Sequence, residues 1–178
     1  LGEGKGVLSQ ILDRRNQLVR PPVANLDCLV IVVSIADPAP VPLLVDQMVA
    51  IAEKNHIEPV IVINKSDLGD TRQWEETYRL AGLPVFALSA LDAEATAPLR
   101  QALAGKLSAF TGNSGVGKSS LLNAMYPTLS LETGEISQKL GRGRHTTRAV
   151  TLYTLPEGGY IADTPGFSSL DMERAQPI

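Results

Sequence analysis

Hydrophobic and polar residues alternate in blocks from about residue 27 onward. Runs rich in Val and Ile, such as 29–33 and 60–63, are typical of strands that are covered on both faces of a sheet. The segments between them carry apolar residues at helical spacing. We expect strands at 29–33, 60–63, 84–88 and 107–111, helices at 41–55, 71–81, 97–104 and from 118 to about 125, and a hairpin of 149–155 with 160–162. This alternation predicts a three-layer α/β sandwich with a mainly parallel sheet.

The first 26 residues follow a different pattern. Loose alternation over 7–12, a turn-like segment at 13–16 and apolar residues at 17–19 predict a short hairpin that ends at Arg20-Pro21-Pro22. Two strands alone are marginally stable, so this hairpin is either an edge addition to the main sheet or the end of another domain. The stiff Pro-Pro joint favours the second interpretation. We therefore expect three parts: 1–26, the end of a preceding domain with its linker; 27–170, the main domain; and 171–178, the start of an extension.

Composition narrows the class of protein. The chain has 178 residues, of which 44% are hydrophobic and 20% charged, as in a globular protein of about one domain. No apolar run reaches the ~18 residues that a membrane span needs. The first residues lack the basic and apolar segments of a secretory signal, and a lone cysteine, Cys28, cannot form an internal disulfide or a cysteine-based zinc site. We expect a cytoplasmic monomer without a membrane partner.

Charge and aromatic content also bear on function. The net charge is −3 and aromatic residues make up 4% of the chain. Binding of nucleic acid by bulk positive charge, or by stacking bases on an aromatic platform, is therefore not expected.

A phosphate-binding motif occupies residues 112–119, which read GNSGVGKS and match G-x-x-x-x-G-K-[ST]. A predicted strand precedes the motif and a predicted helix follows it, so backbone N–H groups and a helix N-terminus can surround phosphate oxygens. The Lys118 ammonium suits the β- and γ-phosphates, and the Ser119 hydroxyl suits Mg²⁺. The alternative is a glycine-rich surface turn before a helix. The candidate binding residues are Gly112, Asn113, Ser114, Gly115, Val116, Gly117, Lys118, Ser119 and Ser120.

A second motif, Asn64-Lys65-Ser66-Asp67, ends the second buried strand, where α/β folds bind ligands. The Asp67 carboxylate can accept hydrogen bonds from guanine N1–H and its 2-amino group, a donor pair that adenine lacks. The stem of Lys65 can lie along the base, and Asn64 can brace a neighbouring loop. Ser89 and Ala90 end the next strand, where a backbone N–H can meet the guanine 6-oxo group. The alternative for this motif is an Asx-turn with a helix cap.

Residues of a nucleotide switch are expected later in the chain. Asp163-Thr164-Pro165-Gly166 follows a predicted strand, so Asp163 can hold Mg²⁺ from the outer shell and the Gly166 N–H can sense a γ-phosphate. The alternative is an ordinary turn. Segment 141–148 is rich in Arg and Gly, and Thr146 or Thr147 could complete the Mg²⁺ shell; Thr147 is favoured because it lies beside the following strand. The arginines of segment 141–148 either lie in a solvated loop or contact phosphate or RNA.

The order of these motifs is unusual for a GTPase, because the guanine motif precedes the phosphate loop. This order predicts a circularly permuted GTPase domain, with the original termini joined at 104–106. Where many GTPases place a water-orienting Gln after the switch glycine, this chain has Phe167, so we expect slow intrinsic turnover. His145 is the nearest candidate for the missing group; the alternative, a solvated loop histidine, is favoured by residue type alone. Lys118, His145 and Gly166 are therefore the candidate catalytic residues.

With these motifs in place, the chain resembles the ribosome small-subunit-dependent GTPase family (RsgA, also called YjeQ). The resemblance lies in 112–123, 141–147, 163–167 and the RPPVAN entry at 20–25. It implies a Mg²⁺-dependent GTPase that binds GTP and GDP and acts in late maturation of the 30S subunit. It also implies that the enzyme contacts the rRNA of this subunit and is stimulated by the subunit. It also implies flanking domains: an N-terminal OB barrel, whose last strands could occupy 1–20, and a C-terminal zinc domain, for which this chain has no ligands.

Three other functions compete with this interpretation. An ATP-using P-loop enzyme is disfavoured by 64–67, which suits guanine. A non-hydrolysing nucleotide-dependent binding module is compatible with Phe167 but not favoured by Lys118, Ser119 and Asp163. A permuted GTPase of the large ribosomal subunit is disfavoured by segment 142–147 and by the hairpin before Pro21.

Overall fold

A computed structural model describes residues 9–11, 13–18, 23–129 and 150–163. The strands are β1 (Gln17–Leu18), β2 (Val23–Ala24), β3 (Cys28–Ser34), β4 (Glu58–Asn64), β5 (Val85–Ala87), β6 (Leu107–Thr111), β7 (Thr151–Thr154) and β8 (Tyr160–Asp163). The α-helices are α1 (Pro42–Lys54), α2 (Arg72–Leu80), α3 (Ala97–Leu103) and α4 (Lys118–Met125), and short 3-10 turns lie at η1 (Ser66–Leu68), η2 (Glu94–Thr96) and η3 (Pro127–Leu129).

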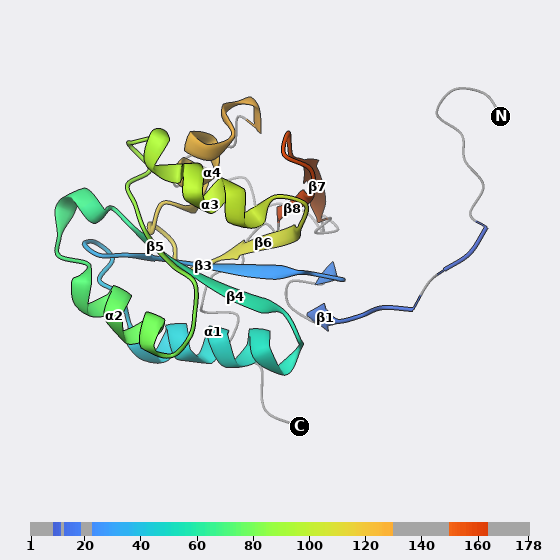
Figure 1. Ribbon diagram of the computed structural model, residues 1–178, viewed down its shortest axis with the longest axis horizontal. Coiled ribbons are helices and arrows are strands. Elements are labelled where there is room, and N and C mark those ends of the chain that lie inside the picture. Colours follow the sequence, from blue (N-terminus) through green and yellow to red (C-terminus); the bar gives the residue numbers. More distant parts are fainter. Residues whose placement is uncertain (1–8, 12, 19–22, 130–149, 164–178) are drawn as a thin grey trace, which may run out of the picture.

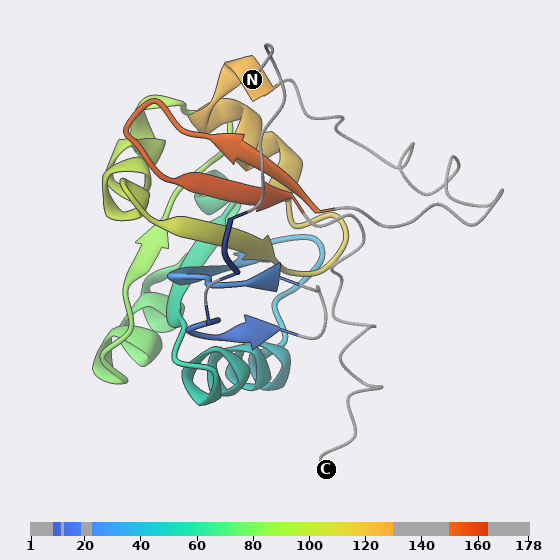
Figure 2. The same cartoon turned by 90° about the vertical axis from the view of Figure 1, so that its right-hand side faces the viewer.

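Six of these strands form one sheet in the order β5-β4-β3-β6-β8-β7 (Figure 1). Every neighbouring pair is parallel except β7 with β8, which form an antiparallel hairpin beside β6 (Figure 2). The register pairs Val30 with Val60 and Ser34 with Asn64, so β3 and β4 end level with each other. The predicted mainly parallel sheet is confirmed, and the loops after its parallel strands emerge at one edge.

Helices cover both faces of the sheet, with α1 and α2 on one side and α3 and α4 on the other (Figure 1). Successive residues of β3 explain this arrangement, because they point to opposite faces. Leu29 and Ile31 pack in the cluster that contains Met48 of α1, whereas Val30 and Val32 pack in the cluster that contains Leu99 of α3. The continuous Val and Ile runs are therefore buried from both sides, and the three-layer sandwich is confirmed.

The predicted permutation link, 104–106, connects α3 to β6 and lies against the turn of the β7–β8 hairpin. Gly105 donates its backbone N–H to the carbonyl of Gly158 at 2.9 Å, and Tyr160 donates to the carbonyl of Lys106, also at 2.9 Å. Both contacts fix the start of β6 relative to β8. The link thus holds the starts of two neighbouring strands, β6 and β8, together.

The N-terminal hairpin differs from the sequence prediction in its pairing. β1 pairs with β2, matching Leu18 with Val23, so the second strand follows the prolines instead of preceding them. Among residues 9–11, none lies in a strand, and the Ile11 side chain is 83% exposed. The reason is burial: Leu18 and Val23 both enter the same hydrophobic cluster as Leu29, a contribution that Ile11 does not make.

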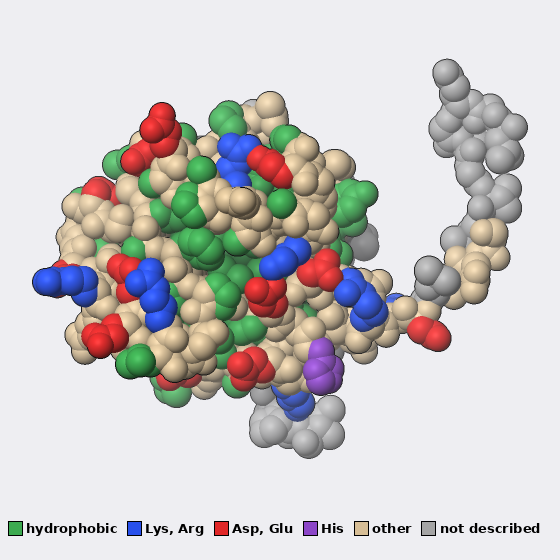
Figure 3. Space-filling model, in the orientation of Figure 1, with side chains coloured by type: hydrophobic (Ala, Val, Ile, Leu, Met, Phe, Trp, Pro, Cys, Tyr) green, Lys and Arg blue, Asp and Glu red, His purple; other side chains and the backbone are tan. Residues whose placement is uncertain are grey.

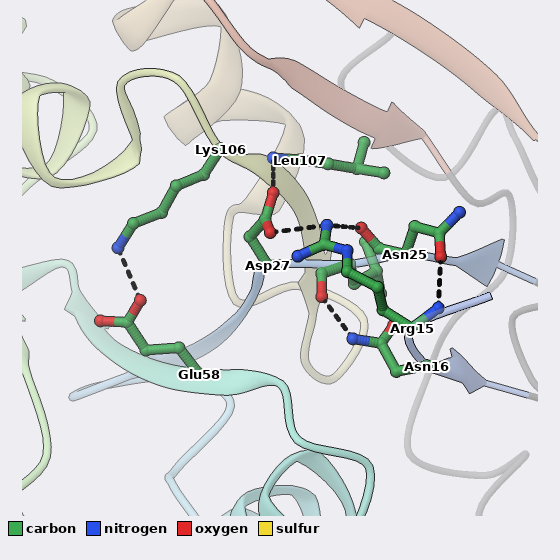
Figure 4. Close-up of polar contacts among 8 residues, drawn as sticks. Arg15, Asn16, Asn25, Asp27, Glu58, Lys106 and Leu107 are labelled. Carbon is green, nitrogen blue, oxygen red and sulfur yellow. Dashed lines mark hydrogen bonds and ion pairs between the residues drawn. The ribbon is translucent and has the colours of Figure 1, made fainter. Parts of the chain in front are cut away.

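A polar network joins this hairpin to the base of the main sheet (Figure 4). Arg15 pairs with the Asp27 carboxylate at 2.9 Å, and the other oxygen of Asp27 accepts the N–H of Leu107, the first residue of β6, at 2.8 Å. The Asn16 side chain donates to the Leu26 carbonyl at 2.7 Å. Burial alone would raise the pKa of Asp27, but the hydrogen bonds from Leu107 and Arg15 outweigh it and hold this pKa below its usual value.

The surface agrees with a small net charge. Acidic and basic side chains are interspersed over the face shown in Figure 3, without a field of one sign. Across the described ranges, every helix is too short or too polar to span a bilayer.

Candidate nucleotide site

The candidate site lies at the edge of the sheet where the parallel strands end. The phosphate motif follows β6, the guanine motif follows β4, and Ser89–Ala90 follows β5. Because β4, β3 and β6 are adjacent in the sheet, the loops that follow them lie side by side. Segments that are far apart in the sequence are thereby brought to one place, as expected for ligand sites in α/β sheets.

The loop from 112 to 117 has a backbone that requires glycine at its two ends. Gly112 has φ +143°, and a Cβ there would lie 2.1 Å from the Val32 carbonyl oxygen of β3. Gly117 has φ +91°, and a Cβ there would lie 2.4 Å from the Asn64 amide nitrogen. The glycines of the motif therefore permit close packing against β3 and β4 as well as the curvature of the loop.

Lys118 is the first residue of α4, and its ammonium lies against the backbone of the loop. It donates to the carbonyl oxygens of Gly112 and Asn113, both at 2.8 Å. Burial lowers its pKa. Ser119 follows in the first helical turn and is half-buried, whereas Ser114, Gly115 and Ser120 are exposed.

Asn64 joins the phosphate loop to the loop after β5. This side chain is 1% exposed, its amide nitrogen donates to the Val116 carbonyl at 2.8 Å, and its amide oxygen accepts the Ala90 N–H at 3.0 Å. Both halves of the amide are thus used. The bracing role that the sequence suggested for Asn64 corresponds to these two bonds.

Lys65 reaches the phosphate loop from the other side. Its ammonium donates to the Gly115 carbonyl at 3.0 Å and also to the Asp37 carbonyl. Asp67 lies two residues further on, in η1, and its side chain is exposed. The guanine motif and the phosphate motif are therefore in direct contact, with the Asp67 carboxylate available to solvent beside them.

Ser89 shapes the loop after β5. Its hydroxyl accepts the N–H of Leu91 at 3.3 Å, and its carbonyl accepts the N–H of Asp92 at 3.0 Å. These bonds turn the chain immediately beyond Ala90. The Ala90 N–H itself is directed to Asn64, so in this structure it is engaged with protein.

Several predicted site residues fall outside the described part of the chain. His145, Thr146, Thr147 and Gly166 belong to this group. Asp163 is the last residue of β8, which runs parallel to β6. The backbone of Asp163 therefore reaches the same edge of the sheet as the phosphate loop. Within the residues that are described, no group of three or more His, Cys, Asp or Glu is arranged to hold a metal ion.

Sequence reasoning missed the turn after β3. Asp37 accepts a hydrogen bond from Lys65, and Pro38 lies beside the phosphate loop, because a Cβ on Gly115 would be 3.4 Å from its Cδ atom. A usable signal existed: a polar Ser34 ends an otherwise apolar strand, and prolines follow at 38, 40 and 42. Without a known motif, this signal could not be assigned to the site.

A parallel sheet in this order, with a glycine loop between β6 and α4 and an N-K-x-D motif that precedes it in the chain, defines the class of circularly permuted P-loop GTPases. Two solved structures support the class. The crystal structure of YjeQ from Thermotoga maritima matches 94% of this chain and 57% of its own with a TM-score of 0.74 and 38% identity. That of YloQ, described as a circularly permuted GTPase, matches 94% and 54% with a TM-score of 0.69 and 36% identity.

The chain belongs to the RsgA GTPase family, whose model matches residues 11–173. It is 47% identical over 176 residues to the small ribosomal subunit biogenesis GTPase RsgA of Caldanaerobacter subterraneus subsp. tengcongensis, covering 97% of this chain and 60% of that protein. It is 44% identical over 181 residues to the Thermotoga maritima protein of the same name, covering 98% and 61%. The chain thus spans about three-fifths of these relatives.

Proposed function

We propose that this chain binds GTP and GDP and hydrolyses GTP. The observation that carries the proposal is the direct contact between the two motifs: Lys65 on Gly115, and Asn64 on Val116. A base-reading loop and a phosphate-reading loop must be joined at a fixed spacing to hold one nucleotide at both ends. The membership of the RsgA GTPase family supports the same assignment.

Guanine selectivity is assigned to Asp67. An ionised carboxylate is an acceptor at both oxygens, and it matches the two neighbouring donors on the guanine edge. Adenine would leave the carboxylate without those donors, which is costly inside a binding site. In this proposal the stem of Lys65 lies along the base and the backbone at Ser89 and Ala90 lies beside the 6-oxo group, with the Ala90 N–H shared between that group and the Asn64 amide oxygen that accepts it here.

Mg²⁺ is the metal that suits this site. Ser119 stands at the start of α4 beside Lys118, and Asp163 ends the strand next to β6. Hydroxyl and carboxylate oxygens are the hard ligands that Mg²⁺ prefers. We assign Ser119 and Thr147, or Thr146 in its place, to the metal, and Asp163 to its outer shell. Bound Mg²⁺ would neutralise charge on the phosphates.

Hydrolysis needs stabilisation of the γ-phosphate and an oriented water. Lys118 and the loop N–H groups supply the first, together with the N–H of Gly166. Phe167 cannot orient water, so intrinsic turnover is slow, and His145 is the candidate for that role. Replacement of His145 by Ala should then abolish stimulated turnover while leaving GDP affinity unchanged; stimulated turnover that persists would remove His145 from the mechanism.

The whole protein is proposed to act on the 30S ribosomal subunit in its late maturation, in contact with rRNA and in the cytoplasm. The curated relatives are named small ribosomal subunit biogenesis GTPases, which supports this partner. In this proposal 27–170 is the GTPase domain, and OB and zinc domains flank it in the full-length protein. The test is GTP turnover of the full-length protein with isolated 30S or 50S subunits. Stimulation by 30S alone is expected; stimulation by 50S alone, or none, contradicts the assignment.

A substitution at the base-reading position tests nucleotide identity. An Asn at 67 still accepts from N1–H but presents an N–H₂ donor, which fits the 2-oxo group of xanthine and opposes the 2-amino group of guanine. Asp67→Asn should weaken GDP binding about 100-fold or more and strengthen XDP binding. Asp70→Asn is the matched control, because Asp70 is an exposed carboxylate that pairs with Arg72. An unchanged preference for GDP would refute the role of Asp67.

A further inference from the structure

The turn after β3 is organised by one buried hydroxyl group. Ser34, the last residue of β3, is 0% exposed. Its hydroxyl accepts the N–H of Ala36 at 3.3 Å and donates to the carbonyl of Asp37 at 3.4 Å. The two bonds, both long, bring residues 34–37 into a turn in which the Ser34 hydroxyl contacts the Asp37 carbonyl.

This turn reaches the candidate nucleotide site at two points. The Asp37 carbonyl and the Gly115 carbonyl both accept from the ammonium of Lys65, so this one side chain connects the turn with the phosphate loop. Pro38 lies close to the phosphate loop, since a Cβ on Gly115 would lie 3.4 Å from its Cδ atom. The turn therefore lies beside both the phosphate motif and the guanine motif.

The backbone of Lys65 shows how closely its position is determined. It has φ 60° and ψ 35°, a left-handed conformation that is unfavourable for a residue other than glycine. The neighbouring peptides are fixed: the Asn64 carbonyl accepts the N–H of Ile35 at 3.1 Å, and the N–H of Ser66 donates to the Leu88 carbonyl at 3.2 Å. Such a conformation persists where the surroundings impose it, and it is frequent at functional sites.

We infer that Ser34 is a positioning residue for nucleotide binding. Its hydroxyl fixes the Asp37 carbonyl, and that carbonyl, together with Gly115, holds the ammonium of Lys65. The Lys65 stem is thereby kept where it can lie along the base. The inference rests on the proposed binding of guanine nucleotides, and it adds to that proposal a residue outside both recognised motifs. A merely structural Ser34 would support the end of β3 without affecting Lys65.

The first test is Ser34→Ala in the full-length protein. The Kd for fluorescent GDP should rise about fivefold, which corresponds to about 1 kcal/mol, the usual worth of a neutral hydrogen bond. KM for GTP should rise by a similar factor, with kcat at saturation within twofold of the wild type, because Ser34 ends β3 and lies outside the phosphate motif. Ser108→Ala is the matched control: Ser108 is also 0% exposed, but it lies near the start of β6, at the opposite end of the sheet. The GDP affinity of the Ser108→Ala variant should equal that of the wild type.

The second test asks whether Ser34 acts through Lys65. Lys65→Ala should weaken GDP binding by about tenfold or more, and adding Ser34→Ala to it should cause no further loss, because the ammonium that the turn holds is gone. Additive effects overturn the inference, as does an unchanged affinity in Ser34→Ala. Ser34→Cys, which retains the size of the side chain with a weak donor, replaces Ser34→Ala if that variant does not fold.

Failure of the inference can be told apart from failure of the proposed function. If the wild-type protein binds no GDP, the proposed function is wrong and the inference with it. If the wild type binds GDP and the Ser34 variants bind it equally well, the inference alone is overturned.

Discussion

The buried Asn64 amide offers a sharp prediction, because its two hydrogen bonds hold three loops together. Asn64→Ala removes the donor to Val116 and the acceptor of Ala90. Each buried polar group left without its partner costs about 1–3 kcal/mol. Val116 is 3% exposed, so its carbonyl has no easy access to water, whereas the half-buried Ala90 can recover part of the loss. We therefore expect the free energy of unfolding to fall by about 2–4 kcal/mol.

Urea unfolding without nucleotide, followed by far-ultraviolet circular dichroism, measures this loss directly. A destabilisation of this size corresponds to a fall in Tm of roughly 10 °C for a domain of this length. GDP affinity should fall as well, since Val116 belongs to the phosphate loop and Ala90 to the proposed guanine site.

A matched control comes from Asn55, whose amide nitrogen donates to the Ile51 carbonyl at 2.7 Å at the end of α1. Asn55→Ala removes one half-buried hydrogen bond away from the site, so it should cost about 1 kcal/mol and leave GDP affinity unchanged. If Asn64→Ala is no more destabilising than Asn55→Ala, the reasoning about the buried amide is refuted.

Three further predictions follow from the site and from the base of the sheet. Lys118→Ala should abolish GTP turnover in a phosphate-release assay, because it removes the charge at the phosphates; measurable turnover would contradict its role. Gly117→Ala should destabilise by about 1–3 kcal/mol in urea, since a Cβ would lie 2.4 Å from the Asn64 amide at φ +91°; equal stability would contradict the close approach. The pKa of Asp27 is lower in the folded state, so the stabilisation by its carboxylate is present above the unfolded pKa near 4 and is lost as the pH falls through the folded pKa. Asp27→Asn should therefore lower the free energy of unfolding by about 1 kcal/mol at pH 7 and by progressively less toward pH 2. A loss that does not depend on pH would argue against the ion pair with Arg15.

Much of the fold could be predicted from local pattern. The runs 29–33 and 60–63, which become the central parts of β3 and β4, are apolar throughout, a pattern that requires cover on both faces and so implies helices on both sides. The phosphate motif was recognisable because its chemistry depends on residue types at fixed spacing within one loop. The same holds for the guanine motif at 64–67, and the order of the two motifs predicted the permutation.

The N-terminal hairpin could not be predicted in the same way. Its pairing depends on where Leu18 and Val23 find apolar partners, and those partners come from β3 and α1. The hairpin is attached to the sheet through Arg15, which pairs with Asp27, and through Asp27, which accepts from Leu107. Asp27 and Leu107 lie 80 positions apart in the sequence. That residues 1–20 carry the end of an OB barrel stays a prediction.

The sequence by itself determined which strands and helices form from β3 onward, and it pointed to the groups that we propose meet a guanine nucleotide, because both follow from residue type and short-range spacing. Tertiary structure alone decided that the Ser34–Pro38 turn faces the phosphate loop and that Lys65 joins the two. Those contacts depend on the parallel register of β3 with β4 and β6, which brings the ends of three strands to one edge. An apolar run does not by itself say which residues of another strand it pairs with, since the register also depends on how the connecting segments position the strands.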